Sequence, residues 1–201
     1  MTMPNTGVIL AGGNHQRLPG INKALVTIGR KRVIDYLLDS FRDLFREIII
    51  VTNEPTLFLD TDALIVSDLY NTRSSLNGIY SGLFHASASH AFFTACDMPF
   101  IKKELIQTIC HASEPQISIT IPQTQKGFEP LCAVYGKTCL RPIEDQIAKG
   151  IPKIMGFFNR VKVKAVPESL LRQADPELES FFNVNTPDDL ANAKKHVNGS
   201  T

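Results

Sequence analysis

The chain has 201 residues, of which 43% are hydrophobic and 20% charged, and its formal net charge is +1. This composition is ordinary for a globular protein, and the near-zero charge excludes the basic surface of a protein that coats nucleic acid. No stretch reaches the roughly 18 apolar residues of a membrane span, and the N-terminus has no signal-peptide pattern. We therefore expect a cytoplasmic protein with one domain, residues 1–201, and with no nucleic-acid and no membrane partner.

The four cysteines form no C-x-x-C pair, and the five histidines are scattered along the chain. Neither residue type therefore has the spacing of a zinc site. We expect reduced thiols that are mostly buried as small hydrophobic side chains.

The first predicted element is a buried strand at residues 8–11, which Gly12 and Gly13 end. A polar loop with Arg17 and Lys23 follows. Glycines allow a sharp turn whose N–H groups approach a ligand closely, and two cations six residues apart suit a ligand with several phosphates. The alternative is a tight turn with solvated charges. The loop matches neither the P-loop nor the G-x-G-x-x-G fingerprint.

Strands and helices alternate along the rest of the chain. Short, mostly β-branched or alternating runs predict strands at residues 24–28, 47–51, 63–66, 92–96, 116–121, 129–135 and 161–166. Apolar residues spaced by three and four predict helices at residues 33–44, 76–84, 105–109 and 140–147, and Thr186 and Pro187 start a last, capped helix. Buried strands joined by helices require right-handed crossovers. The predicted fold is α/β, three-layered and Rossmann-like, with a mostly parallel sheet and helices on both faces.

Gly78 and Gly82 lie four residues apart on the second predicted helix. Each glycine costs roughly 1 kcal/mol against alanine in a helix. We expect the close approach of a backbone or a ligand there, and a tight contact between helix and sheet would also explain the pair.

Polar residues follow several predicted strands where each one ends: Gly12 and Gly13, then Asn53, Asp68 and Asp97. Ligands of open parallel sheets bind beyond the carboxyl ends of the strands, so these residues predict a site, although any one strand-end Asp is more often a turn or a cap. Asp97 has apolar neighbours in sequence. A buried carboxylate is costly without a partner, and Mg²⁺ is usually held by one or two carboxylates together with substrate phosphates.

Several segments resemble motifs of one protein family. Residues 10–13 with Arg17 and Lys23 resemble the L-A-G-G-x-x-x-R-M-G-x-x-K signature of nucleotidyltransferases, and residues 96–100 resemble the C-D-M-P-F motif. The further resemblances are residues 129–133 to E-P-L-C-A, residues 183–187 to N-V-N-T-P, and Asp68 with residues 74–78 to D…G-P-L-A-G. Together they cover almost the whole chain, which looks like a molybdenum cofactor guanylyltransferase.

The chain departs from the family pattern at three places. Leu18-Pro19 stands where Met-Gly is usual, Asn22 where Asp is common, and Ser74-Ser75 where the family has Gly-Pro. The predicted cations Arg17 and Lys23 are retained.

The resemblance implies a fold like that of nucleotide-diphospho-sugar transferases and a set of site residues. Asp97 would ligate Mg²⁺, Asp68 would contact guanine, and Lys153 falls near a basic position of the family. The implied catalytic residues are Arg17, Lys23 and Asp97. The implied nucleotide-binding residues are Leu10, Ala11, Gly12, Gly13, Lys23, Asn53, Asp68, Gly78 and Asp97, with Asn183 and Asn185 on the side of the pterin-bearing substrate.

The resemblance also implies a reaction: the phosphate of molybdopterin attacks the α-phosphorus of GTP, and pyrophosphate leaves. Mg²⁺ is the implied cofactor, and GTP, molybdopterin and an acceptor molybdoenzyme or its chaperone are the implied partners. Three alternatives stay open. They are a cytidylyltransferase that acts on the same pterin, a sugar-phosphate nucleotidyltransferase, and a non-catalytic carrier of a nucleotide or cofactor.

Overall fold

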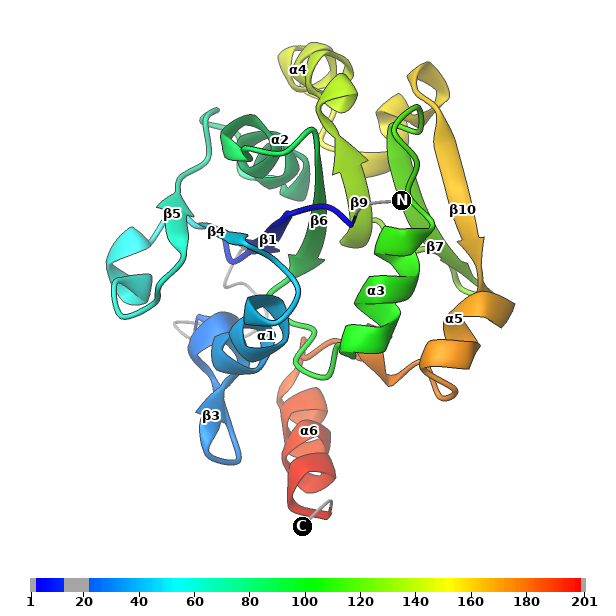
Figure 1. Cartoon of the computed structure of the whole chain (residues 1–201). Coiled ribbons are helices and arrows are strands. Elements are labelled where there is room, and N and C mark those ends of the chain that lie inside the picture. Colours follow the sequence, from blue (N-terminus) through cyan, green and yellow to red (C-terminus); the bar gives the residue numbers. More distant parts are fainter. Residues whose placement is uncertain (1–2, 13–21, 200–201) are drawn as a thin grey trace.

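A computed structural model of the chain describes residues 3–12 and 22–199. Its centre is an eight-stranded mixed sheet in the order β10-β7-β9-β6-β1-β4-β5, with β8 paired to β7 outside this path (Figure 1). The strands are β1 (Thr6–Leu10), β4 (Glu47–Val51), β5 (Leu64–Val66), β6 (His90–Ala95), β7 (Ile119–Thr124), β8 (Gly127–Phe128), β9 (Cys132–Gly136) and β10 (Val163–Pro167).

Helices cover both faces of this sheet (Figure 1). On one face, α1 (Val33–Arg42), α3 (Lys103–His111) and α5 (Glu168–Ala174) contribute apolar side chains to one buried cluster. On the other face, α2 (Ser75–His85), α4 (Leu140–Ala148) and the 3₁₀ segment η4 (Ile154–Arg160) build a second cluster. The predicted three-layer α/β fold is confirmed.

The order of the parallel strands reverses next to β1. β1 pairs in parallel with β4 on one side and with β6 on the other, so the chain first builds the sheet outward through β4 and β5 and then crosses back to β6. The carboxyl ends of β1 and β6 therefore flank a switch point, which is where open α/β sheets bind their ligands. Beyond β6, the antiparallel β9 separates it from β7.

Four sequence-based predictions of local structure need correction. Residues 24–28 are not one strand, because Lys23–Leu25 is a 3₁₀ turn and only Thr27–Ile28 is extended, as β2 in a hairpin with β3 (Lys31–Arg32). The strand predicted at residues 116–121 does not end before Pro122, because Pro122 lies inside β7. Residues 129–131 form a loop before β9. Sequence periodicity also missed α5 and the 3₁₀ segments η2 (Pro55–Phe58), η3 (Lys137–Cys139) and η5 (Glu179–Phe181).

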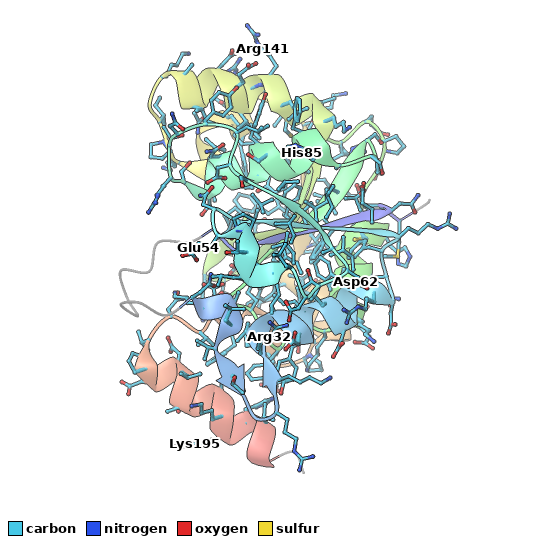
Figure 2. All side chains as sticks on the ribbon, turned by 90° about the vertical axis from the view of Figure 1, so that its left-hand side faces the viewer. Arg32, Glu54, Asp62, His85, Arg141 and Lys195 are labelled. Carbon is cyan, nitrogen blue, oxygen red and sulfur yellow. The ribbon has the colours of Figure 1, made fainter. Side chains whose placement is uncertain are left out.

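The last helix, α6 (Pro187–Gly199), lies against the β2–β3 hairpin rather than against the central sheet (Figures 1 and 2). Ala193 of this helix and Val184 before it join Ile28 and Val33 in a small buried cluster. The predicted cap is confirmed, because the N–H of Asp189 donates to Oγ1 of Thr186 at 3.1 Å. The cluster and the cap place the segment before α6 close to the carboxyl edge of the sheet.

Charged side chains cover the outer surfaces, as Arg141 on α4 and Lys195 on α6 illustrate (Figure 2). All four cysteines are buried and free, as expected. Among residues 3–12 and 22–199, no helix combines the length and the apolar character that crossing a bilayer requires.

Candidate active site

A cavity of about 370 Å³ opens at the carboxyl ends of β1, β4 and β6. Its walls come from segments far apart in the sequence: the end of β1, the 3₁₀ turn η1 (Lys23–Leu25), the loop before α2, the end of β6 and the segment before α6. The lining residues are Leu10, Ala11, Gly12, Asn22, Lys23, Val51, Asp68, Arg73, Ser74, Ser75, Gly78, Ala95, Cys96, Asp97, Leu131 and Asn185.

Lys23 and Asp97 both border this cavity. Nζ of Lys23 donates to Oδ1 of Asn185 at 2.6 Å. Oδ1 of Asp97 is buried and has no hydrogen-bond partner among the residues that the structure describes. Burial raises the pKa of the Asp97 carboxyl, and the nearby Lys23 ammonium only partly opposes this rise. Asp97 is therefore a desolvated carboxylate that borders the same cavity as the Lys23 ammonium.

Backbone hydrogen bonds hold the end of β1 in place just before Gly12. The N–H of Ala11 donates to the carbonyl of Val51 at 2.8 Å, and the N–H of Cys96 donates to the carbonyl of Leu10 at 3.0 Å. These bonds extend the pairing of β1 with β4 and β6 to the cavity wall. A Cβ added at Gly12 would lie 3.8 Å from Nδ2 of Asn53 and 3.8 Å from the carbonyl oxygen of Val51, so Gly12 lies beside the end of β4.

Asp68 and Asn53 form a reciprocal pair beside this edge. Nδ2 of Asn53 donates to Oδ2 of Asp68 at 2.8 Å, and the backbone N–H of Asp68 donates to Oδ1 of Asn53 at 3.3 Å. Burial raises the pKa of the Asp68 carboxyl, while the Asn53 amide and the positive charge of Arg73 act in the opposite direction. Asn53 thus orients Asp68 from behind, and Arg73 adds a cation to the same wall.

The two glycines of α2 serve different contacts. A Cβ at Gly82 would lie 2.6 Å from Cγ1 of Val8 and 2.9 Å from Cε1 of Phe93, so Gly82 allows the helix to touch the sheet. A Cβ at Gly78 would lie 3.2 Å from Cδ2 of Leu10 at the cavity wall. Of the two explanations that the sequence allowed, tight helix–sheet packing is confirmed at Gly82. Gly78 packs against Leu10 of β1 and also lines the cavity, so the approach of a ligand there stays a prediction.

Two departures from the family pattern have a local structural role. Oδ1 of Asn22 accepts from the N–H of Ala24 at 3.1 Å and caps the η1 turn that carries Lys23. Oγ of Ser74 accepts from the N–H of Asn77 at 3.2 Å and caps α2. Both residue types are preferred at helix N-caps, so each substitution still fixes the start of its element.

The structure brings together most of the residues that the sequence singled out. Those that line the cavity are Leu10, Ala11, Gly12, Lys23, Asp68, Gly78, Asp97 and Asn185. Asn53 lies behind Asp68, and Nδ2 of Asn183 donates instead to the carbonyl of Phe181 at 3.2 Å. Lys153 lies at the start of η4, away from the cavity lining. Gly13, Arg17, Leu18 and Pro19 lie outside the described residues.

Among the described residues, Arg73 is a charged lining residue that sequence reasoning missed. It belongs to the polar loop before α2 and borders the cavity next to Ser74 and Ser75. The available signal was a lone cation directly before a serine-capped helix, which is too common a pattern to mark a site by itself.

A second cavity, of about 500 Å³, lies between the β7–β8 hairpin, α5 and α6. Aromatic rings of Phe100, Phe181 and Phe182 line it together with the carboxylate of Glu129. Burial raises the pKa of Glu129. One short stretch of the chain contributes to both cavities, because Glu129 borders the second cavity and Leu131 borders the first.

Among the described residues, no three His, Cys, Asp or Glu side chains gather as a ready-made metal site. A cation at Asp97 would therefore need oxygen ligands from a bound molecule or from water. This is how Mg²⁺ is usually bound, with one or two carboxylates and substrate phosphates.

The cavity lies at the switch point of a mostly parallel sheet, which is where α/β proteins of this topology bind their ligands. Comparison with known proteins identifies the class, because residues 7–163 match the model of the MobA-like NTP transferase domain. The chain belongs to this family of nucleotidyltransferases.

Its relatives agree with this assignment. The chain is 39% identical to the molybdenum cofactor guanylyltransferase of Desulfosudis oleivorans, over 96% of this chain and 95% of that protein. It is also similar to the crystal structure of molybdopterin-guanine dinucleotide biosynthesis protein A from Archaeoglobus fulgidus, with a TM-score of 0.86, 30% identity and coverage of 96% and 99% of the two chains. A cytidylyltransferase structure from Thermus thermophilus, at 12% identity and a TM-score of 0.66, shares the fold.

Proposed function

We propose that the chain is a molybdenum cofactor guanylyltransferase, which transfers GMP from GTP to the phosphate of molybdopterin. The observation that carries the proposal is that Lys23 and Asp97 border one cavity at the switch point of the sheet, in a chain whose full-length relatives bear this name. The products would be a guanine dinucleotide form of the cofactor and pyrophosphate.

The triphosphate would lie along the edge that Gly12 and Lys23 form. An ammonium group has three N–H donors, and one of those on Lys23 is used by Asn185. The other two remain for phosphate oxygens. Gly13 and Arg17 would also contact the triphosphate. Their part in the proposal rests on the sequence alone, because both lie outside the described residues.

Mg²⁺ would bind at Asp97. Oδ1 of this residue is buried and has no hydrogen-bond partner among the described residues. A carboxylate oxygen of this kind is a suitable ligand for a hard divalent cation. When bound, the ion would supply charge neutralisation to the triphosphate. The chain's own contribution is to hold the carboxylate in place: the carbonyl of Asp97 accepts from the N–H of Val184 at 2.8 Å.

Asp68 and Arg73 favour guanine as the base. A carboxylate alone would not select guanine, because it could also accept from the amino group of cytosine. Guanine differs in presenting the acceptors O6 and N7 in addition to its amino group. Asp68, held by Asn53, supplies the acceptor, and Arg73 supplies a fork of donors on the same wall. Leu10 and Gly78 would form the apolar floor under the ring.

The acceptor would approach from the side of Asn183 and Asn185. Asn185 borders the first cavity, and the second cavity, with its phenylalanine rings and Glu129, would have room for a flat heterocycle. An oxygen of the pterin phosphate would form a bond to the α-phosphorus while the bond from that phosphorus to the bridging oxygen breaks. Because this phosphate is already ionised near neutral pH, positioning and charge neutralisation suffice without a strong general base.

Three parts of the proposal rest on sequence and relatives. Residues 1–201 would act as one nucleotidyltransferase domain, the protein would work in the cytoplasm, and an acceptor molybdoenzyme or its chaperone would take the product. The alternatives are a cytidylyltransferase, a sugar-phosphate nucleotidyltransferase and a non-catalytic carrier.

Release of pyrophosphate tests the proposal directly. The purified chain is incubated with Mg²⁺ and either GTP or CTP, and with molybdopterin, a sugar 1-phosphate or no acceptor. We expect pyrophosphate only with GTP, Mg²⁺ and molybdopterin together. A preference for CTP or for the sugar phosphate would contradict the proposed substrates, and nucleotide binding without any pyrophosphate release would favour the carrier.

A further inference from the structure

The short segment 183–186, which leads into α6, contacts both principal residues of the site. The N–H of Val184 donates to the carbonyl oxygen of Asp97 at 2.8 Å. One residue further on, Oδ1 of Asn185 accepts from Nζ of Lys23 at 2.6 Å. The position of this one segment therefore determines where the ammonium of Lys23 lies relative to Asp97.

Asp189, in the first turn of α6, holds that segment. A single carboxylate oxygen, Oδ2, accepts from the N–H of Asn185 at 3.0 Å and from the N–H of Thr186 at 2.8 Å. In return, the N–H of Asp189 donates to Oγ1 of Thr186 at 3.1 Å. The hydroxyl of Thr186 and the two amides hold the pKa of Asp189 below its ordinary value, so the carboxylate is charged at neutral pH.

The geometry points to Asp189 as a positioning residue for nucleotidyl transfer: it fixes the backbone of Asn185 and thereby the ammonium of Lys23. This inference rests on the proposed function. Lysine has a flexible four-carbon stem, so Lys23 needs a fixed partner if its charge is to meet the triphosphate in one place. Asn185 is that partner, and its own backbone is fixed by Asp189.

The role is separable from holding α6 on the protein. Ala193 and Val184 pack with Ile28 and Val33 in a buried cluster that does not involve Asp189. The helix therefore keeps its main anchor when the carboxylate is removed. The Thr186 hydroxyl can also be removed while the carboxylate oxygen that accepts from the amides of Asn185 and Thr186 stays in place.

These contacts define four variants of the full chain. Asp189→Ala removes the acceptor of the Asn185 amide. Asp189→Asn keeps one acceptor oxygen, removes the charge and replaces the other oxygen by an NH₂ group. Thr186→Ala frays the cap but leaves Asp189 bonded to Asn185. Asp188→Ala is the matched control, because Asp188 is an exposed carboxylate in the same turn.

Steady-state guanylyl transfer and melting temperature are measured for each variant. We expect Asp189→Ala to lower kcat about tenfold to a hundredfold, with a smaller change in KM for GTP. Asp189→Asn should recover most of kcat, and Thr186→Ala should keep kcat within about twofold even though it lowers the melting temperature. Equal kcat losses in Thr186→Ala and Asp189→Ala, or an Asp189→Asn variant as impaired as Asp189→Ala, would overturn the inference.

A second readout separates this inference from the proposed function. The rate at which an amine-selective reagent modifies Lys23 is measured by mass spectrometry without any substrate. Asp189→Ala should raise that rate several-fold, and Asp189→Asn and Asp188→Ala should not. If the wild-type chain makes no dinucleotide, the proposed function fails, while the labelling rates still test whether Asp189 positions Lys23. If the chain is active and the labelling rate is the same in all variants, only the positioning role of Asp189 is contradicted.

Discussion

Lys23 and Asn185 are 162 positions apart in the chain and are joined by one hydrogen bond. The sequence predicted each of them for the site, Lys23 from its neighbouring glycines and Asn185 from its motif. It did not predict their contact, because the contact depends on how α6 packs on the β2–β3 hairpin. A local pattern marks which residue types are present, and only the tertiary packing determines which of them meet.

Ser74 and Arg73, which are adjacent in sequence, illustrate the same limit. Ser74 was predictable as a cap, because serine before an apolar helical run is a preferred N-cap, and it does cap α2. Arg73 was not predictable as a cavity residue, because its place near Asp68 depends on the path of the loop between β5 and α2.

Replacing Lys23 by alanine should raise the barrier for guanylyl transfer by about 2–4 kcal/mol, which is the scale of losing one fixed donor to developing charge. The ratio kcat/KM for GTP measures this effect. Lys31→Ala is a suitable control, because Lys31 is a lysine of the nearby hairpin that pairs with Asp39 at the surface. Near wild-type turnover of the Lys23→Ala protein would argue against a role for Lys23 in the reaction.

At the scale of elements, Pro122 shows why one strand boundary was wrong. Proline lacks an N–H and usually disrupts a ladder. In β7, however, pairing with β9 covers only Ile119 and Thr120, and pairing with β8 covers only Gln123 and Thr124. Pro122 is in register with Val166 of β10 on one side, and on the other side it falls in the gap between the β8 and β9 ladders, where its carbonyl accepts from the N–H of Glu129 at 3.1 Å. The strand tolerates proline because no N–H is needed there.

The contact between α2 and β1 predicts a destabilised Gly82→Ala protein. Alanine would gain up to about 1 kcal/mol in helix propensity, but its methyl would lie 2.6 Å from Cγ1 of Val8. We expect overpacking to prevail and the free energy of unfolding to fall by about 1–3 kcal/mol. Urea denaturation measures the difference, with His85→Ala at the exposed end of the same helix as the control. A Gly82→Ala protein more stable than the wild type would contradict this packing.

At the scale of the whole molecule, the sequence predicted the alternation of strands and helices, and hence the layers, but not the strand order. The layers follow from hydrophobic periodicity within each segment. The insertion of the antiparallel β9 between β6 and β7 depends on pairing between residues such as Phe92 and Val134, which no single segment encodes. This insertion places Leu131 at the first cavity and Glu129 at the second.

A partly buried ion pair between Lys102, at the start of α3, and Asp175 joins the C-terminal third of the chain to this helix, and it should make stability depend on pH. Burial would raise the pKa of Asp175, but hydrogen bonds from Lys102, at 2.8 Å, and from Ser180 prevail and hold the pKa below its ordinary value. A carboxylate whose pKa is depressed by folding stabilises the protein above its unfolded pKa, and this contribution is lost as the pH falls through its folded pKa.

Asp175→Asn should therefore lower the free energy of unfolding at pH 7 by about 2–3 kcal/mol, the scale of a charged hydrogen bond. The difference from the wild type should shrink below the ordinary aspartate pKa of about 4. Urea denaturation at several pH values between neutral and acidic conditions measures it, with the exposed Asp188→Asn as the control. A difference that stays constant with pH would show that Asp175 is not ionised in the folded protein.

The central claim is that one cavity holds the triphosphate of GTP between Lys23 and a cation on Asp97. A crystal structure of the chain with Mn²⁺ in place of Mg²⁺ and a GTP analogue that cannot be cleaved at the α-phosphorus tests it most directly. We predict an anomalous peak coordinated by Asp97 and by phosphate oxygens, with Nζ of Lys23 on the same triphosphate and guanine between Asp68 and Arg73. A nucleotide bound elsewhere, or a metal ion that does not touch Asp97, would contradict the account.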